Sequence, residues 1–430
     1  MSISSLVRFK QIVFWTTFLL MIAAMIGQTV WHLYKYITGI YKTTIFSEML
    51  LNYEGGFVRR GFLGEVLFLL RESIPFNVAD AVLLLYYGSF FFLTWLLVRL
   101  CIKHGWSLFL LPFPVFMYLY LCDPYFMAGK RDCIILLMSY IAFLLYRRYV
   151  DNRSFVRLLI VNLWIVVALL IHEAFLFFGV IIIIFHLCSL LYRERHNLIK
   201  GIILSCIYWS PVLITLFIIY MYSGNINGII EVISSWELYI DLGPAEQSYI
   251  YNTVGSLSLK DVVEHVFCVA WLSPIIWEIP KFPFNFVVLF FLYYCLTSIN
   301  TIDLKLYKLA DFDHIQLSNI LLLQASFLLP LSLFLFSDLA RLLSYWSFSS
   351  LFFFHFFEDR NEFPQGLTLI SIRLQKFIDS YKYSHSQWMY WGGLLLLPIG
   401  WFGATLTGMF PFIPNELKHL IMGVEMSVNY

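Results

Sequence analysis

The chain has 430 residues, of which 60% are hydrophobic and only 13% charged, with a net charge of +1 and a mean hydropathy of +0.79. A soluble domain has about 45–50% apolar and about 25% charged residues, and it could not bury this much apolar surface. The composition excludes a soluble enzyme and a disordered scaffold, and the balanced charge offers no basic face for nucleic acid. We expect an all-α, polytopic membrane protein, because the apolar runs are too long for the strands of a barrel.

Eleven segments are long and apolar enough to cross a membrane, since one crossing takes roughly 20 apolar residues. These predicted spans are 12–35, 78–98, 105–121, 132–147, 155–172, 174–192, 200–222, 283–300, 316–336, 342–357 and 387–409. The first is too long for the core of a signal peptide, so we interpret it as an uncleaved span. Segment 260–280, which Pro274 and Pro280 interrupt, is expected to be re-entrant or interfacial. One integral helical bundle over residues 1–430 is the simplest assignment.

Lys and Arg concentrate on the cytoplasmic side of membrane proteins. An N-terminus in the cytoplasm places a majority of the 28 Lys and Arg residues in cytoplasmic segments. Three longer pieces then do not span: an outer juxtamembrane loop with helices at 37–77, a large outer loop at 223–282 and a cytoplasmic segment at 358–386. Within the last of these, the stretch 367–381 is amphipathic, and we expect it to lie on the inner leaflet.

Charged residues in or beside a span are costly, so they mark either a functional site or a tight structural pair. The first such group is the run 52–61, which contains Glu54, two adjacent glycines, Arg59 and Arg60. Adjacent glycines allow the backbone to approach a ligand closely, and neighbouring arginines can bind a phosphate through bidentate hydrogen bonds. An amphipathic helix over 57–70 is expected to begin here, and a helix N-terminus also attracts anions. The alternative is that these arginines only anchor an interfacial helix.

The second group lies in the short loop between the third and fourth spans and holds Asp123, Lys130, Arg131 and Asp132. Lys130 and Arg131 would add positive charge to the same outer face. Asp132, at the start of the next span, is expected to orient Arg131. The alternative is an internal salt bridge that caps the span and binds no ligand.

The third group is His172 and Glu173, at the outer end of the fifth span, within the strongly apolar stretch 165–184. An unpaired carboxylate at this place would carry a large desolvation cost. Glu173 is therefore expected either to pair with an arginine or to keep a proton at a raised pKa. Metal ligation is not favoured, because no second His or Cys stands at ligand spacing.

The fourth group is Asp338 and Arg341, which are three residues apart and can meet as an ion pair on a helix. A structural pair and a functional pair are equally compatible with this spacing. Under the predicted topology all four groups lie on the outer face. Their cations are Arg59, Arg60, Lys130, Arg131 and Arg341, and their acids are Glu48, Glu54, Asp123, Asp132, Glu173 and Asp338. This mixture predicts a pocket that binds an anion such as a lipid-linked pyrophosphate, with a remaining carboxylate as base.

In these features the chain resembles the Wzy-type O-antigen and capsule polymerases and, more widely, the GT-C glycosyltransferases. The resemblance rests on the many spans, the 19% aromatic content and the outer-face arginines and acids. A carboxylate in the first outer loop typically acts as the base in GT-C enzymes, which implies Glu54 here and Glu48 second. Outer-loop arginines in an R-x-G pattern engage the lipid pyrophosphate in Wzy-type polymerases. The matching run is Arg59-Arg60-Gly61, which implies that role for Arg59.

The resemblance implies polymerisation of undecaprenyl-pyrophosphate-linked glycan repeats at the outer, periplasmic face of a bacterial inner membrane. The candidate bases are Glu54, Glu173 and Asp132. The candidate substrate-binding residues are Arg59, Arg60, Lys130, Arg131, His172, Asp338, Arg341 and Asp123. The expected partners are the lipid-linked oligosaccharide and the bilayer, without nucleic acid, metal or soluble cofactor. Whether a chain-length regulator also takes part stays open.

Two alternatives remain at this point. One is a GT-C enzyme that adds a single sugar from a polyprenyl-phosphate donor. The other is a flippase for lipid-linked glycans or another transporter. A transporter is expected to show internal repeats and polar groups at mid-depth, with a polar path through both leaflets. An enzyme of the outer face is expected to be closed on its cytoplasmic side.

Overall fold

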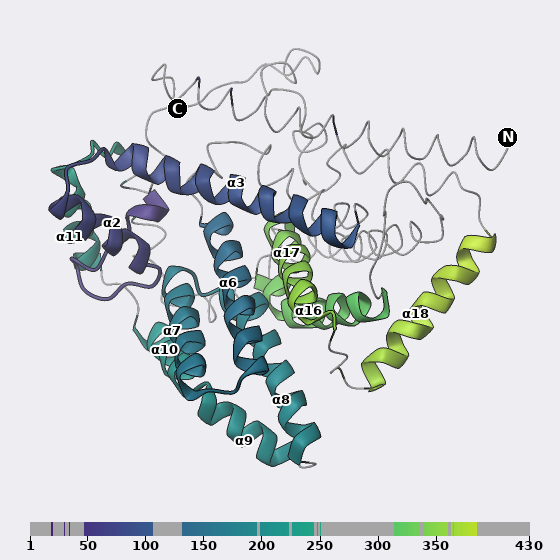
Figure 1. Ribbon diagram of the computed structural model, residues 1–430. Helices are drawn as coiled ribbons and strands as arrows, with labels where there is room; N and C mark the ends of the chain where they lie inside the picture. The colour runs from purple at the N-terminus through teal and green to yellow at the C-terminus, as the bar shows by residue number, and fades with distance from the viewer. Residues whose placement is uncertain are drawn as a thin grey trace, which may run out of the picture.

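The computed structural model describes residues 47–105, 131–195, 198–222, 226–244, 314–334, 339–359 and 365–384, with a few isolated positions besides. Every regular element in these ranges is a helix, as the composition predicts (Figure 1). Three helical units in them are long and apolar enough to cross a membrane, namely α3 (Val78–His104), α6 (Asp132–Asp151) and Leu176–Glu194. A bent pair of helices raises this number to four, so the structure supports a membrane protein but not the full set of eleven spans.

Other predicted spans coincide with described helices. These helices are α7 (Phe155–Ile171), η3 (Leu176–Val180) with α8 (Ile181–Arg195), α16 (His314–Phe334) and α17 (Leu339–Phe357). Predicted spans 12–35, 105–121, 283–300 and 387–409 lie outside the described residues apart from isolated positions, as does segment 260–280.

The predicted span 200–222 coincides with two helices and not with one straight helix. It consists of α9 (Leu198–Tyr208) and α10 (Ser210–Met221), which are bent by 70° relative to each other. Pro211 stands in the first turn of α10, where its missing N–H costs little but where it cannot continue a preceding helix. The side-chain amide of Asn162 in α7 donates to the Tyr208 carbonyl oxygen at 3.0 Å, which stabilises the break.

Helices α6 and α17 run in the same direction, and α3 crosses them obliquely (Figure 1). At one end the Tyr345 hydroxyl of α17 donates to the Asp132 carboxylate at the start of α6. At the other end Nε2 of His104 lies 3.0 Å from Nδ1 of His355, and Arg147 of α6 donates to a backbone carbonyl of α17 at 2.8 Å. The predicted order of spans also makes these two helices parallel, because they correspond to the fourth span, 132–147, and the tenth, 342–357.

We name the two ends of α6 the Arg131 end and the Arg147 end. Twenty residues of α-helix separate them, which corresponds to about 30 Å, the thickness of the hydrocarbon core of a bilayer. Between the two ends the bundle is packed with aromatic rings. Phe143 meets Phe353 edge to face at 5.3 Å, and Phe353 stacks on Phe357 at 4.5 Å.

Two helices flank the segment 47–61 at the Arg131 end, namely α2 (Phe62–Ser73) and α11 (Ile226–Glu237). Helix α2 therefore begins later than the sequence predicts, after the two arginines. Gly55 lies directly against the backbone of Gly228 in α11, so that a side chain on Gly55 would overlap it. Part of the predicted large outer loop is thus helical, and it supports the loop that carries the arginines.

Helix α18 (Gln365–Ser384) covers the predicted amphipathic stretch and packs beside α16 at the edge of the bundle (Figure 1). The Ser371 hydroxyl of α18 donates to the Asn319 side chain of α16 at 2.5 Å. Leu369 and Ile370 of α18 are more than half exposed. The position of α18 on the inner leaflet stays a prediction.

Candidate functional site

The loop that carries Arg59 and Arg60 has an unusual backbone. Short helix η1 (Ser47–Leu50) precedes a turn in which the Gly56 N–H donates to the Tyr53 carbonyl at 2.9 Å. Gly56 has a φ of +95°, which glycine adopts without cost. Arg60 has a φ of +66°, which is costly for a residue with a side chain. Surrounding contacts must therefore hold Arg60 in this conformation.

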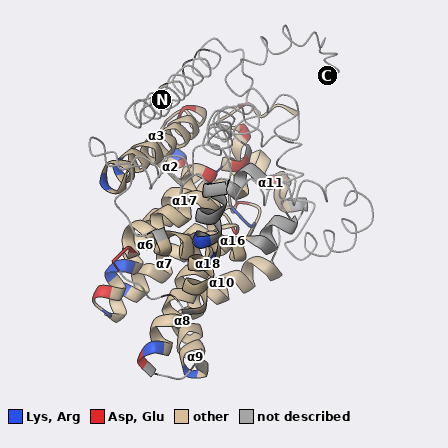
Figure 2. Cartoon of the chain, turned by 90° about the vertical axis from the view of Figure 1, so that its right-hand side faces the viewer, with Lys and Arg blue, Asp and Glu red and all other residues tan. Residues whose placement is uncertain are grey.

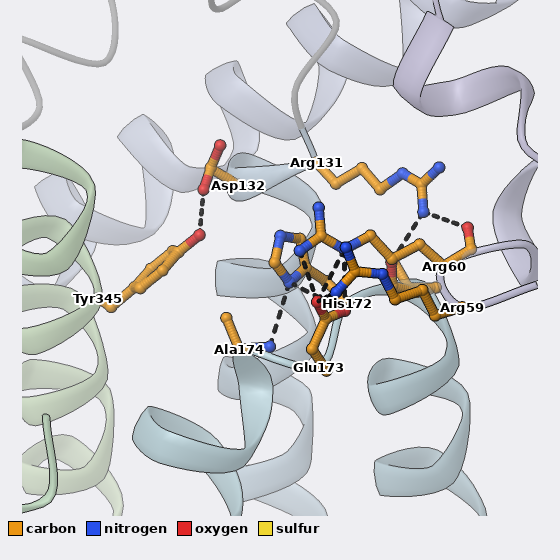
Figure 3. Close-up of polar contacts among 9 residues, drawn as sticks. Arg59, Arg60, Arg131, Asp132, His172, Glu173, Ala174 and Tyr345 are labelled. Carbon is orange, nitrogen blue, oxygen red and sulfur yellow. Dashed lines mark hydrogen bonds and ion pairs between the residues drawn. The ribbon is translucent and has the colours of Figure 1, made fainter. Parts of the chain in front are cut away.

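Glu173 supplies the main contact of both loop arginines. Arg60 binds its carboxylate through two nitrogens, with Nε 2.9 Å from Oε2 and Nη2 2.5 Å from Oε1. Arg59 adds Nη1 at 3.3 Å from Oε1 (Figure 3). Of the two possibilities that the sequence leaves for Glu173, pairing with arginine is therefore the one that holds.

The charge state of Glu173 follows from these neighbours. Burial has the largest single influence on the pKa of Glu173, and it favours the neutral carboxyl group. The positive charges of Arg60, His172 and Arg59, with the Arg60 hydrogen bond, outweigh it and hold the pKa of Glu173 well below its ordinary value. Since Nδ1 of His172 accepts a hydrogen bond from the Ala174 N–H at 3.1 Å, we assign most of this effect to the two arginines. Glu173 is an ionised partner at neutral pH.

Arg131 is completely buried and lies on the other side of the Arg60 loop. Its Nη1 donates to the carbonyl of Arg60 and, at 2.9 Å, to the carbonyl of Ile171 (Figure 3). Burial lowers the pKa of Arg131 to about 10, and the charge of Glu48 opposes this shift, so that the side chain stays charged at neutral pH. The expectation that Asp132 orients Arg131 is wrong, because two backbone carbonyls hold the guanidinium instead.

Asp132 is buried at the first position of α6 and points away from Arg131 (Figure 3). It accepts a hydrogen bond from Tyr345, whose ring stacks on Phe178 at 4.4 Å. Sequence reasoning missed Tyr345, because a tyrosine within an aromatic-rich helix carries no distinguishing pattern.

His172 ends α7, and its ring accepts the Ala174 N–H through Nδ1. After a turn at Glu173 and Ala174 the chain enters the π-helical turn η3. Such turns are rare and occur frequently at functional sites. Nδ1 of His172 is also 3.8 Å from Oε2 of Glu173. We define the arginine cluster as Arg59, Arg60, Arg131, His172 and Glu173.

The two carboxylates of the first outer segment have different surroundings. Glu54 is exposed, and its backbone N–H donates to the Asn52 side chain at 3.4 Å. Glu48 is buried, with 8% of its surface exposed, and its charge acts on Arg131. The structure therefore brings Glu48, and not Glu54, to the arginine cluster.

Four predicted site residues cannot be placed. Asp123, Lys130 and Asp338 lie outside the described residues. Arg341 falls in the first turn of α17, where the backbone is described but the side chain is not. Their roles stay predictions from the sequence.

The charges at the Arg147 end are arranged differently. Arg147 binds Asp359 with two nitrogens at 2.7 and 2.8 Å and also contacts Asp151, and Arg153 meets Glu194 at 2.5 Å. Charged residues gather at the lower ends of α6, α8 and α9, below long uncharged stretches (Figure 2). These arginines each have a carboxylate of their own, whereas Arg59 and Arg60 share one.

Comparisons of the chain with protein-family models, with curated proteins and with solved structures find no match.

Proposed function

We propose that the protein polymerises glycan repeats that are linked to a polyprenyl pyrophosphate, at the outer face of a bacterial inner membrane. The supporting observation is the excess of guanidinium groups in the arginine cluster. Arg59 and Arg60 share Glu173, and two nitrogens of Arg131 have no acceptor among the described residues. Such a site suits a pyrophosphate, since guanidinium groups bind phosphate oxygens in pairs.

The depth of the cluster supports a lipid-linked substrate. The phosphates of such a substrate lie at the membrane surface, while its hydrocarbon tail lies among the lipids. The arginine cluster is formed at the ends of α6 and α7 and not halfway along them. This position allows the protein to bind the pyrophosphate while the tail stays in the bilayer.

The proposed reaction is glycosyl transfer. The hydroxyl of the acceptor repeat attacks the anomeric carbon of the donor glycan, and the bond from that carbon to the pyrophosphate oxygen breaks. Negative charge then builds on the leaving pyrophosphate, where fixed positive charges stabilise it. A carboxylate takes the proton of the attacking hydroxyl.

Glu48 is the base in this proposal. A carboxylate with a strongly lowered pKa is a weak base, which disfavours Glu173. Glu54 is exposed, and Asp132 is hydrogen-bonded to Tyr345. Glu48 is buried and lies within electrostatic range of Arg131. The resemblance ranks Glu54 before Glu48, and our proposal reverses this order.

The alternatives are less well supported. The paired charges at the Arg147 end and the aromatic packing above them favour an enzyme over a transporter with a path through both leaflets. A single-sugar transferase would use the same chemistry and differs only in its product.

The surface glycan of a strain that lacks the gene tests the proposal. On a gel we expect the ladder of chain lengths to collapse to a core with one repeat, and the wild-type gene to restore it. Glu54→Gln should also restore the ladder, whereas Glu48→Gln should not. Complete loss of the glycan with a truncated lipid-linked intermediate would instead indicate a single-sugar transferase. A finished repeat trapped on the inner leaflet would indicate a flippase.

A further inference from the structure

Arg131 has a hydrogen-bonding edge that the protein does not use. Its Nη1 is committed to the carbonyls of Arg60 and Ile171. Its Nε and Nη2 are buried without an acceptor in the part of the chain that the structure describes. The N–H groups of Nε and Nη2 lie along one edge of the guanidinium plane, and this edge binds two oxygens of a phosphate or carboxylate at once. Buried donors of this kind are rarely left unsatisfied.

Tyr53 provides a second unused donor nearby. Its hydroxyl is buried and has no partner among the described residues. The ring is held in place, because it stacks on Phe57 at 5.7 Å and occupies the space that a side chain at Gly61 would fill. Tyr53 lies beside Arg131 because its ring packs against Gly61, and Arg131 donates to the carbonyl of Arg60, the residue before Gly61.

The Arg60–Glu173 ion pair determines where this edge points. The two carbonyls that hold Nη1 belong to Arg60 and to Ile171, which is two residues before Glu173. The ion pair joins the loop of Arg60 to the corner between α7 and η3, and so keeps both carbonyls together. In Figure 3 the nitrogens of Arg131 that make no contact lie on the side of its guanidinium away from Glu173.

We propose that a phosphate oxyanion binds to Nε and Nη2 of Arg131 and to the hydroxyl of Tyr53, and that Arg60 and Glu173 are positioning residues for this Arg131–Tyr53 site. The inference rests on the proposed function and refines it. It assigns the substrate contact to Arg131, whereas the R-x-G pattern assigns it to Arg59. The pyrophosphate of a lipid-linked glycan and the head group of a phospholipid share the required chemistry.

Binding of inorganic pyrophosphate to the purified full chain tests the site. We would measure it by calorimetry in nanodiscs of phosphatidylcholine. Arg131→Lys keeps the charge but loses the two-donor edge, and it should weaken binding about tenfold or more. Tyr53→Phe removes only the hydroxyl and should weaken binding about fivefold. The controls Arg148→Lys and Tyr192→Phe, at exposed positions of the Arg147 end, should bind like the wild type.

The outcomes separate this inference from the proposed function. Binding that is absent from the wild type, or unchanged by both site variants, overturns the inference. Should Arg131→Lys fail to fold, Tyr53→Phe and its control still decide. The expected binding pattern in a protein that makes no polymer supports the site and rejects the polymerase. Anionic phosphatidylglycerol in the nanodisc identifies the source: if it abolishes pyrophosphate binding, the ligand is a phospholipid head group, and if binding persists, the ligand is a pyrophosphate.

Discussion

At the residue scale, the arginine cluster depends on one carboxylate that serves two cations. Glu173 has 12% of its side chain exposed and receives three nitrogens from Arg60 and Arg59. Without it, two largely buried guanidinium groups would repel each other, and the costly backbone conformation of Arg60 would lose one of the contacts that hold it. Glu173 therefore contributes to folding as well as to the geometry of the site.

We expect Glu173→Gln to destabilise the protein by about 3–5 kcal/mol at pH 7, because it removes the carboxylate that two largely buried arginines share. Chemical unfolding in detergent would measure this. As the matched control, Asp151→Asn removes one of the two carboxylates around Arg147, the one with 44% of its side chain exposed, and should cost at most about 1 kcal/mol. A Glu173→Gln variant as stable as the wild type would contradict the account.

The difference in stability between the wild type and Glu173→Gln should depend on pH with a definite sign. The folded protein holds the pKa of Glu173 well below the ordinary value of 4.5, so the stabilisation is present above that value and is lost as the pH falls through the folded pKa. The difference in melting temperature between the wild type and Glu173→Gln should be constant from pH 7 to about 5 and narrow below it. A difference that stays constant down to the most acidic condition would contradict this assignment.

Sequence patterns identified the members of the cluster better than their roles. Intramembrane charge is rare enough to single out Arg59, Arg60, Arg131 and Glu173. Their separate roles depend on which backbone carbonyls accept hydrogen bonds from Arg131. These carbonyls come from segments far apart in the chain. Tyr53 gave no signal at all, because its importance lies in a hydroxyl that the fold leaves without a partner.

At the element scale, continuous apolar runs predicted most described helices, because in lipid a single segment satisfies its backbone within itself only as a helix. At 200–222 the same criterion predicted helix but not the bend, since α9 and α10 are both apolar and composition does not report a bend. The break combines Pro211 with a hydrogen bond from Asn162 in another helix. Pro211 can be read from the sequence, whereas the hydrogen bond from Asn162 can be seen only in the tertiary structure.

Asn162→Leu tests the contribution of that hydrogen bond to the bend. It keeps the approximate size of the side chain but removes the donors to the Tyr208 and Leu158 carbonyls, and should cost about 1–3 kcal/mol. Thr215→Val is the control, because it removes a hydrogen bond to Pro211 within α10 itself and should cost less. Equal melting temperatures for Asn162→Leu and the wild type would show that Pro211 alone maintains the bend.

At the scale of the whole molecule, the protein has two unlike ends. Residues predicted to lie outside, such as Arg60 and Arg131, gather at the Arg131 end, and residues predicted to be cytoplasmic, such as Arg147 and Arg153, gather at the Arg147 end. The predicted topology assigned these two sets of arginines to opposite sides of the membrane, because successive spans cross it in alternating directions. Which end faces the cytoplasm stays a prediction from the sequence.

Reconstituted polymerisation is the most direct test of the central claim. The purified protein in liposomes would be given the polyprenyl-pyrophosphate-linked repeat that accumulates in the strain without the gene. We predict products that lengthen by one repeat at a time, with one polyprenyl pyrophosphate released per step and no added metal or cofactor. Tyr53→Phe should slow this reaction and Tyr192→Phe should not. Repeats that stay single while the wild-type protein is folded and correctly inserted would contradict the account.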